Sequence, residues 1–189
     1  MVCGQAAEAR EALRAIAVLM PDLAIIDIVL KGSSGLDLLK TLKLQYPKLP
    51  VLVLSMHDES LYAERVLRGG AKGYIAKSEA TENLVTAIHR VLKGEIYLSD
   101  KMASRILSRL VHREPGKSIS PLEHLTDREL EVFQRIGQGH GSREIAAQLH
   151  LGVKTIESYR ERIKKKLKLQ NARELIRHAV QWVQTTGAG

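Results

Sequence analysis

Residues 125–167 constrain the fold more than any other part of the chain, because they predict three short helices in succession. Thr126 lies three residues before Glu129 and ahead of apolar residues at helical spacing, which is the capping-box pattern of a helix start. Three glycines between positions 137 and 141 favour the left-handed backbone found beyond helix ends. We therefore expect the first helix to begin at Thr126 and to end near these glycines.

A second short helix and a longer third helix follow. Ser142 is the expected N-cap of the second helix, and residues 151–153 form the expected turn. The third helix should run from about Lys154 to position 167 or 168. At about 100° per residue, one of its faces gathers the residues that should pack against the first two helices: Ile156, Ile163, Leu167, Tyr159 and the stem of Arg160.

The opposite face of the third helix is polar and basic. Between positions 154 and 168, seven Lys or Arg oppose two Glu, so this segment carries a charge of +5. A solvated helix face is the alternative explanation, but a basic helix after a short helix and a tight turn is typical of proteins that enter the major groove of DNA. The expected base-edge readers are Glu157, Ser158 and Glu161, and the expected phosphate-binding residues are Lys154, Thr155, Arg160, Arg162 and Lys165.

The first half of the chain has a different pattern. Residues 1–95 alternate between short β-branched runs and amphipathic helices, which predicts a parallel sheet with flanking helices. The expected strands cover residues 23–28, 51–55 and 73–76, with a weak fourth at 2–5. The expected helices cover about residues 8–19, 35–45, 60–68 and 81–93. The predicted fold class is therefore α/β, a doubly wound parallel sheet, linked to an all-α domain.

Three polar residues stand near the carboxyl ends of the three main predicted strands, where open α/β sheets place their functional groups. They are Asp27, Ser55 and Lys77. A carboxylate can attack a phosphoryl donor, a lysine can pair with the resulting charge, and a hydroxyl can donate a hydrogen bond to it. A lone strand-end aspartate is more often a cap or turn residue, but the three residues together indicate a phosphoryl switch.

Both halves resemble the NarL/FixJ family of response regulators. In the second half, the LuxR-type helix-turn-helix pattern appears as Leu125-Thr126, Arg128-Glu129, the glycines at 137–141, Glu144-Ile145-Ala146, Leu149, Lys154-Thr155-Ile156 and Lys166-Leu167. In the first half, residues 21–27, 34–39, 51–55 and 69–78 resemble a receiver domain of flavodoxin-like topology.

The resemblance implies roles for the residues at the strand ends. Asp27 matches the phosphoacceptor and Lys77 its basic partner. Ser55 and Tyr74 match the pair that repositions on phosphorylation, although an ordinary strand aromatic is the alternative for Tyr74. The resemblance further implies Mg²⁺ as a cofactor, and double-stranded DNA and a sensor histidine kinase as partners.

The start of the chain departs from the family pattern. Receivers begin with a strand that ends in an acidic pair, followed by a first helix, and this sequence begins at what resembles the second strand. Two of the three metal-binding carboxylates of the family are therefore missing, and Asp27 alone is a poor metal site. The strand before Asp27 becomes an apolar edge strand, which is prone to pair with other chains.

We hypothesise that residues 1–20 are mobile, repack against this edge, or let two copies of the chain pair there. An ordered strand at residues 2–5 between two neighbours of a complete sheet would refute this hypothesis. Three origins of the missing strand and helix stay open: a misassigned start site, a deliberately shortened chain, or a receiver that has lost phosphorylation.

The expected domains are a receiver at residues 1–97, a linker helix and flexible linker at 98–121, and a DNA-binding domain at 122–189 with its helix-turn-helix at about 142–161. Ser99 is the expected cap of the linker helix, and Asn171 that of a last helix with an apolar stripe. In the family this last helix, at 171–184, is a homodimer contact; packing on its own domain is the alternative.

Composition limits the possible functions. The net charge of +8 suits an anionic partner, and Cys3, the only cysteine, excludes an internal disulfide. No signal peptide or long apolar stretch appears, so we expect a cytoplasmic protein without membrane contact. No nucleophile–base pair, metal-ligand cluster or phosphate loop indicates an enzyme. We predict a DNA-binding transcriptional regulator, the output half of a two-component phosphorelay; the alternative is a phosphorylation-independent regulator or a protein-interaction module with a degenerate receiver.

Overall fold

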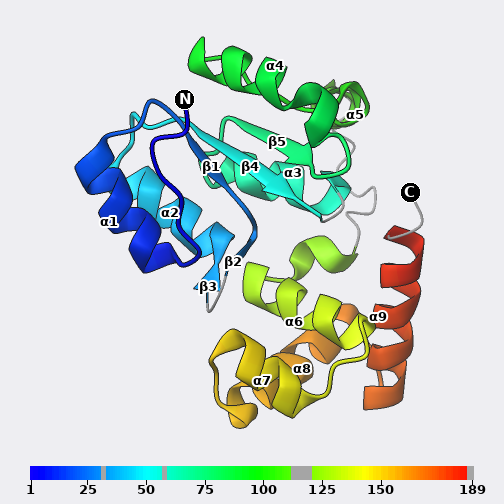
Figure 1. Ribbon diagram of the computed structural model, residues 1–189. Helices are drawn as coiled ribbons and strands as arrows, with labels where there is room; N and C mark the ends of the chain where they lie inside the picture. Colours follow the sequence, from blue (N-terminus) through cyan, green and yellow to red (C-terminus); the bar gives the residue numbers. More distant parts are fainter. Residues whose placement is uncertain (31–32, 57–58, 112–120, 187–189) are drawn as a thin grey trace. The chain divides into compact units, whose positions relative to one another are not determined.

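A computed structural model describes residues 1–30, 33–56, 59–111 and 121–186 (Figure 1). The chain divides into two compact units, residues 1–113 and residues 114–189. The first unit combines a sheet with helices, and the described part of the second unit is helical. This division agrees with the predicted order of an α/β half followed by an all-α half.

The first unit is built around a parallel sheet of three strands in the order β1-β4-β5. These strands are β1 (Ala24–Ile26), β4 (Val51–Ser55) and β5 (Gly73–Ala76). Their register places Ile25 beside Leu52, and Leu52 beside Gly73. The three main predicted strands and their parallel arrangement are therefore confirmed.

Four helices of this unit agree with their predicted ranges to within one residue: α1 (Ala9–Leu19), α2 (Gly35–Gln45), α3 (Glu59–Arg68) and α4 (Ala80–Leu92). Figure 1 shows α4 on one side of the sheet and α1 and α2 on the other. On the α4 side the core consists of Leu52, Ile75, Ala87 and Val91. The helix expected in the linker is α5 (Asp100–Val111). Ser99 caps it as expected, because its Oγ accepts a hydrogen bond of 3.1 Å from the Met102 N–H.

Two details of this unit differ from the predictions. The prediction of a strand at residues 2–5 is wrong. These residues are exposed and pair with no strand in the described part of the chain. A short apolar run forms a strand only where a neighbouring strand satisfies its backbone groups. The sequence also missed the hairpin of β2 (Val29–Leu30) and β3 (Ser33–Ser34), because strands of two residues are too short to show a period.

β1 is an edge strand among the residues that the structure describes, with β4 as its one sheet neighbour. Ile25 in its centre is an apolar residue with 41% of its surface exposed. The strand arrangement that would refute our hypothesis for residues 1–20 is not present between positions 1 and 30, where α1 packs against α2 instead. The three alternatives in that hypothesis therefore stay open.

The second unit contains the 3₁₀ turn η1 (Pro121–His124) and the helices α6 (Asp127–Gly137), α7 (Ser142–Leu149), α8 (Val153–Leu167) and α9 (Ala172–Thr186). Thr126 caps α6 through the predicted capping box: its N–H donates to Glu129 Oε2 at 2.7 Å, and its Oγ1 accepts from the Glu129 N–H at 3.4 Å. Asn171 caps α9, because its Oδ1 accepts from the Glu174 N–H at 3.0 Å. Both predicted caps are confirmed.

The starts of α7 and α8 differ slightly from the prediction. Gly141, and not Ser142, is the N-cap of α7, and the Glu144 carboxylate accepts the Gly141 N–H at 2.8 Å. Gly152 caps α8, which begins at Val153, so the turn covers residues 150–152 rather than 151–153. The turn lies one residue earlier because His150 adopts a left-handed backbone with φ of 53° and ends α7.

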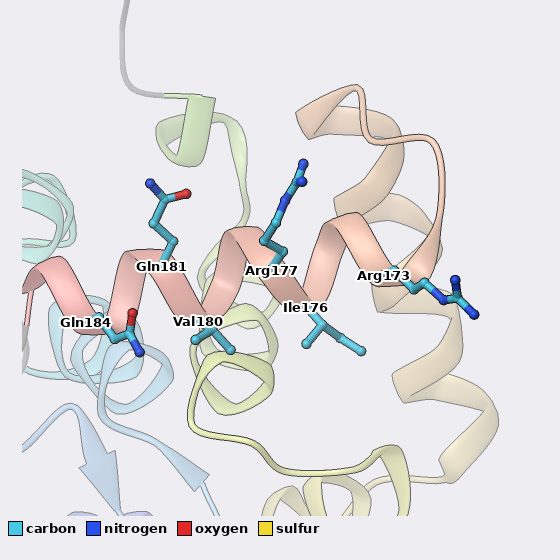
Figure 2. A pocket seen from close by; sticks show the side chains of 6 residues that line it. All are labelled: Arg173, Ile176, Arg177, Val180, Gln181 and Gln184. Carbon is cyan, nitrogen blue, oxygen red and sulfur yellow. The ribbon is translucent and has the colours of Figure 1, made fainter.

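The apolar stripe of α9 is divided between two faces. Leu175 and Ala179 are buried, and the Trp182 ring lies 5.8 Å from that of Phe133 in α6. Ile176 is 44% exposed and lines an open hollow of about 470 Å³ on the outer face of the helix. Figure 2 shows the side chains around this hollow, which are Arg173, Ile176, Arg177, Val180, Gln181 and Gln184. One part of the stripe therefore packs on its own domain, and the other part faces outward.

Candidate phosphoacceptor site and DNA-binding surface

The strand ends of the first unit bring Asp27 and Lys77 into contact. Lys77 Nζ lies 2.5 Å from Asp27 Oδ2, and Asp27 Oδ1 accepts the Val29 N–H at 3.1 Å. The Asp27 side chain is 28% exposed and that of Lys77 is 38% exposed, so solvent and a small donor can reach the carboxylate. The structure thus confirms that these two residues, fifty positions apart, lie together.

Ser55 and Tyr74 lie on the strands beside this ion pair and are fully buried. The Lys77 N–H donates to the Ser55 carbonyl at 2.8 Å, which joins the ends of β4 and β5. We call Asp27, Ser55, Tyr74 and Lys77, the residues that the sequence predicts for a phosphoryl switch, the phosphoacceptor cluster.

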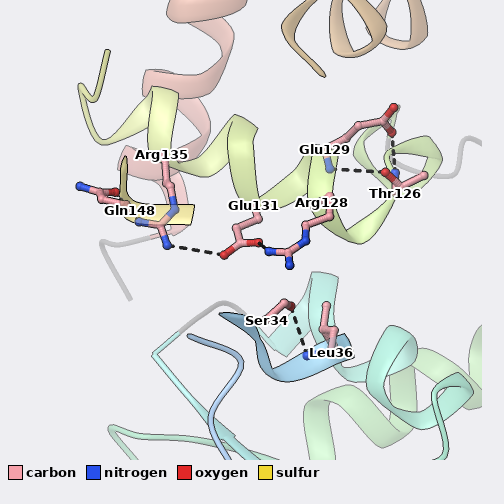
Figure 3. A network of polar contacts seen from close by, with 8 residues as sticks. All are labelled: Ser34, Leu36, Thr126, Arg128, Glu129, Glu131, Arg135 and Gln148. Atoms are coloured by element: carbon pink, nitrogen blue, oxygen red, sulfur yellow. Dashed lines mark hydrogen bonds and ion pairs between the residues drawn. The ribbon is translucent and has the colours of Figure 1, made fainter. Parts of the chain in front are cut away.

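Gly35, which the sequence did not single out as a site residue, shapes the loop after Asp27. Its N–H donates to the Ile28 carbonyl at 2.7 Å, and a Cβ at this position would lie 1.8 Å from the Asp27 carbonyl oxygen. Ser34 caps α2 at the same place, because its Oγ accepts from the Leu36 N–H (Figure 3). The Ser34-Gly35 pair in the sequence was the available signal, since a cap followed by glycine permits a close backbone approach.

The residues around Asp27 do not fit the Mg²⁺ that the family resemblance implies. Mg²⁺ requires near-octahedral oxygen ligands, usually with one or two carboxylates. The described residues contain no cluster of three or more His, Cys, Asp or Glu that could hold a metal ion. One oxygen of the Asp27 carboxylate already pairs with Lys77, so we derive no chemical step through a metal.

In the second unit, α8 has the two faces that the sequence predicted. Ile156 and Ile163 are fully buried, and Leu167, Tyr159 and Arg160 are partly buried. The expected DNA-contacting residues other than Arg160 are all exposed: Lys154, Thr155, Glu157, Ser158, Glu161, Arg162 and Lys165. One surface of α8 thus combines cations, hydroxyls and two carboxylates.

Two ion pairs lie along this surface. Glu157 lies 3.8 Å from Arg160, and Glu161 lies 2.8 Å from Lys164. Ser158 Oγ donates to the Lys154 carbonyl at 2.9 Å. The Arg160 side chain is only 14% exposed, so it is less available to phosphates than the sequence suggested. Glu157 and Glu161 remain 54% and 61% exposed and can accept hydrogen bonds from outside.

A buried carboxylate fastens the far end of α8 to α6. Glu129, 3% exposed at its side chain, accepts from Lys166 Nζ at 2.6 Å as well as from Thr126. Burial alone would raise the pKa of Glu129, but the bonds from Lys166 and Thr126 outweigh it and hold this pKa below its ordinary value of 4.5. The sequence predicted the cap but not the contact with Lys166, because Glu129 and Lys166 are 37 positions apart.

A second network lies along α6 and is drawn in Figure 3 with the Thr126 cap. Glu131 pairs with Arg128 at 2.8 Å and with Arg135 at 3.5 Å. Arg135 also donates to Gln148 near the end of α7. These contacts hold α6 and α7 in the arrangement on which α8 rests.

Comparison with known families covers both units. Residues 1–89 match the model described as "Response regulator receiver domain", and residues 123–179 match the one described as "Bacterial regulatory proteins, luxR family". The first match contains the whole phosphoacceptor cluster, and the second contains the exposed face of α8. No helix in the described ranges is long and apolar enough to cross a membrane.

Individual relatives extend over most of the chain. The oxygen regulatory protein NreC of Staphylococcus haemolyticus is 34% identical over 183 residues, which are 95% of this chain and 84% of that protein. The structure of RcsB from Salmonella enterica serovar Typhimurium bound to promoter P1flhDC in the presence of phosphomimetic BeF3⁻ matches at 25% identity. That match covers 90% of this chain and 81% of the other, with a TM-score of 0.59.

A third relative is a two-component response regulator of the LuxR family from Aurantimonas sp. SI85-9A1. It is 31% identical to this chain, and the match covers 57% of this chain and 76% of the relative, with a TM-score of 0.52. These comparisons favour a DNA-binding two-component response regulator. They do not favour the alternative of a phosphorylation-independent regulator or a protein-interaction module with a degenerate receiver. The chain belongs to the two-component response regulators that join a receiver domain to a LuxR-type DNA-binding domain.

Proposed function

We propose that this chain regulates transcription by placing the exposed face of α8 in the DNA major groove. The observation that carries the proposal is the division of α8 into a buried apolar face and an exposed polar, basic face. Glu157, Ser158 and Glu161 read base edges, and a glutamate carboxylate accepts a hydrogen bond from the cytosine amino group. The phosphate-binding residues are Lys154, Thr155, Arg160, Arg162 and Lys165.

The phosphoacceptor cluster is the proposed input of the regulator. An Asp27 oxygen attacks the phosphorus of a phosphohistidine on a sensor kinase, or of an acyl phosphate; the new O–P bond forms while the donor's P–N or P–O bond breaks, and the leaving group departs with that electron pair. Lys77, 2.5 Å from Asp27, pairs with the added charge. Ser55 and Tyr74 are the proposed residues that reposition afterwards.

The outer face of α9 is the proposed contact between two copies of the chain. Ile176 and Val180 line its hollow, and the segment lies within the predicted dimer helix at 171–184. A homodimer would present two α8 helices to two half-sites of DNA. The domain limits 1–97, 98–121 and 122–189, a cytoplasmic location and the lack of enzymatic activity are parts of the same proposal.

Replacing Lys165 with Ala tests the assignment of the α8 surface. Because Lys165 is exposed and assigned to phosphate, Lys165→Ala should weaken binding of the full chain to all DNA sequences alike and lower the slope of log affinity against log salt by about 1. Fluorescence anisotropy at several salt concentrations measures both quantities. Lys101→Ala, which removes an exposed lysine from α5, is the matched control. A loss confined to one DNA sequence would contradict the phosphate role.

A further inference from the structure

We propose that Glu59 and Ser99 couple the phosphoacceptor cluster to the linker helix α5. Glu59 begins α3, and Ser99 caps α5, so their contact joins two helices that are forty residues apart in sequence. The coupling rests on the proposed function in one respect, the role of Asp27 as the phosphoacceptor. It makes Glu59 and Ser99 positioning residues, which act through α5 and not on a phosphoryl group.

The contact uses both donors of Ser99. The Ser99 N–H donates to Glu59 Oε1 at 3.1 Å, and the Ser99 hydroxyl donates to Glu59 Oε2. The same Ser99 Oγ accepts from the Met102 N–H at 3.1 Å. The carboxylate therefore holds the hydroxyl in the orientation that caps α5. Hydrogen bonds to an ionised group are roughly twice as strong as neutral ones.

Each side of this contact is attached to the cluster. Glu59 follows Ser55, at the end of β4, by four residues. Tyr97, two residues before Ser99, extends the sheet at β5: the Tyr74 N–H donates to its carbonyl at 3.0 Å, and its own N–H donates to the Lys72 carbonyl at 2.9 Å. Tyr74 thus contacts the segment that leads into α5 through its backbone.

A shift of either strand end consequently changes the cap of α5. Lys77 pairs with Asp27 through its side chain and with Ser55 through its backbone, so a change of charge at Asp27 acts on both β4 and β5. Met102, 2% exposed, anchors the first turn of α5, which packs against α3. A movement of β5 relative to α3 therefore alters the distance between Ser99 and Glu59. The first turn of α5 then gains or loses its cap.

Hydrogen exchange of the full chain, followed by mass spectrometry of peptides from residues 97–111, tests the coupling. Glu59→Ala and Ser99→Ala should speed exchange in the first turn of α5 by about fivefold, the effect of a lost cap. Ser99→Thr, which keeps the hydroxyl, should restore normal exchange. Glu64→Ala, which removes another glutamate of α3, is the matched control and should leave this turn unchanged. Equal exchange in Glu59→Ala and the unaltered chain would overturn the proposal.

The second arm changes the charge at Asp27. Introduced alone, Asp27→Asn should change the rate of hydrogen exchange at residues 97–103. Introduced together with Glu59→Ala, it should cause no further change in that rate. The same effect in both backgrounds, or no effect in either, would refute the coupling. Incubation with acetyl phosphate is run in parallel. A failure to add a phosphoryl group would count against Asp27 as the phosphoacceptor, while the Asp27→Asn arm would still decide the coupling.

Discussion

Glu129→Ala is expected to lower the free energy of unfolding of the second unit by about 3 kcal/mol. This value lies at the lower end of the range for broken buried ion pairs, because the partner, Lys166, can be rehydrated. The Glu129 side chain is 3% exposed, whereas Lys166 keeps 35% of its exposure. This loss includes about 1 kcal/mol from the capping box at Thr126, half of which the substitution removes.

Trp182 makes this loss measurable in the full chain. It is the only tryptophan of the sequence and lies against Phe133, so its fluorescence reports the unfolding of the second unit during a urea titration. Glu157→Ala is the matched control, since its carboxylate is 54% exposed and lies 3.8 Å from Arg160; its loss should cost less than about 0.5 kcal/mol. Similar losses for the two variants would contradict a structural role for the buried pair.

Glu129 should also make the stability of the second unit depend on pH. The pKa of Glu129 is lower in the folded unit than its ordinary value of 4.5. The ionised carboxylate therefore contributes its full stabilisation at pH values above the pKa of the unfolded chain, and this stabilisation is lost as the pH falls through the pKa of the folded unit. The stability difference between the unaltered chain and Glu129→Gln should therefore be constant near neutral pH and shrink in acid. Urea titrations from about pH 7 down to about pH 3 measure this difference. A difference that grows as pH falls would have the wrong sign.

Gly137→Ala is expected to destabilise the second unit by about 2 kcal/mol, the cost of overpacking. A Cβ at this position would lie 2.3 Å from the Ala179 carbonyl oxygen and 2.6 Å from Val183 Cγ2, so α9 would have to move away from α6. In an ordinary helix the same change is stabilising by about 1 kcal/mol, which makes the sign of the result diagnostic.

The control for this substitution is Gly141→Ala. A Cβ there meets its nearest heavy atom at 3.7 Å, and the backbone φ is −77°, so steric cost is absent. We expect a loss below about 1 kcal/mol, from the poorer N-cap alone. A displaced α9 should also change the emission of Trp182. If the free energy of unfolding of Gly137→Ala equals or exceeds that of the unaltered chain, α9 is not held closely against α6.

The sequence predicted those features that depend on local pattern. The capping box at Thr126, the two faces of α8 and the three main strands follow from spacing, and the structure has all of them. The placement of Asp27 and Lys77 at strand ends predicted their contact, because parallel strands end at the same edge of a sheet.

Features that depend on tertiary contact were missed. The Glu129–Lys166 pair, the close approach of α9 at Gly137 and the bond between Glu59 and Ser99 join residues that are far apart in sequence. Nothing in the spacing of these residues shows which distant partner each one meets. The wrong strand at residues 2–5 has the same cause, since only a neighbouring strand would have stabilised it.

The central claim, that Asp27 receives a phosphoryl group, is tested most directly by the intact mass of the full chain after incubation with acetyl phosphate and Mg²⁺. We predict a gain of one phosphoryl group in the unaltered chain and in Asp22→Asn, which changes an exposed aspartate outside the cluster, and none in Asp27→Asn. No gain in the unaltered chain, or an equal gain in Asp27→Asn, would contradict the account.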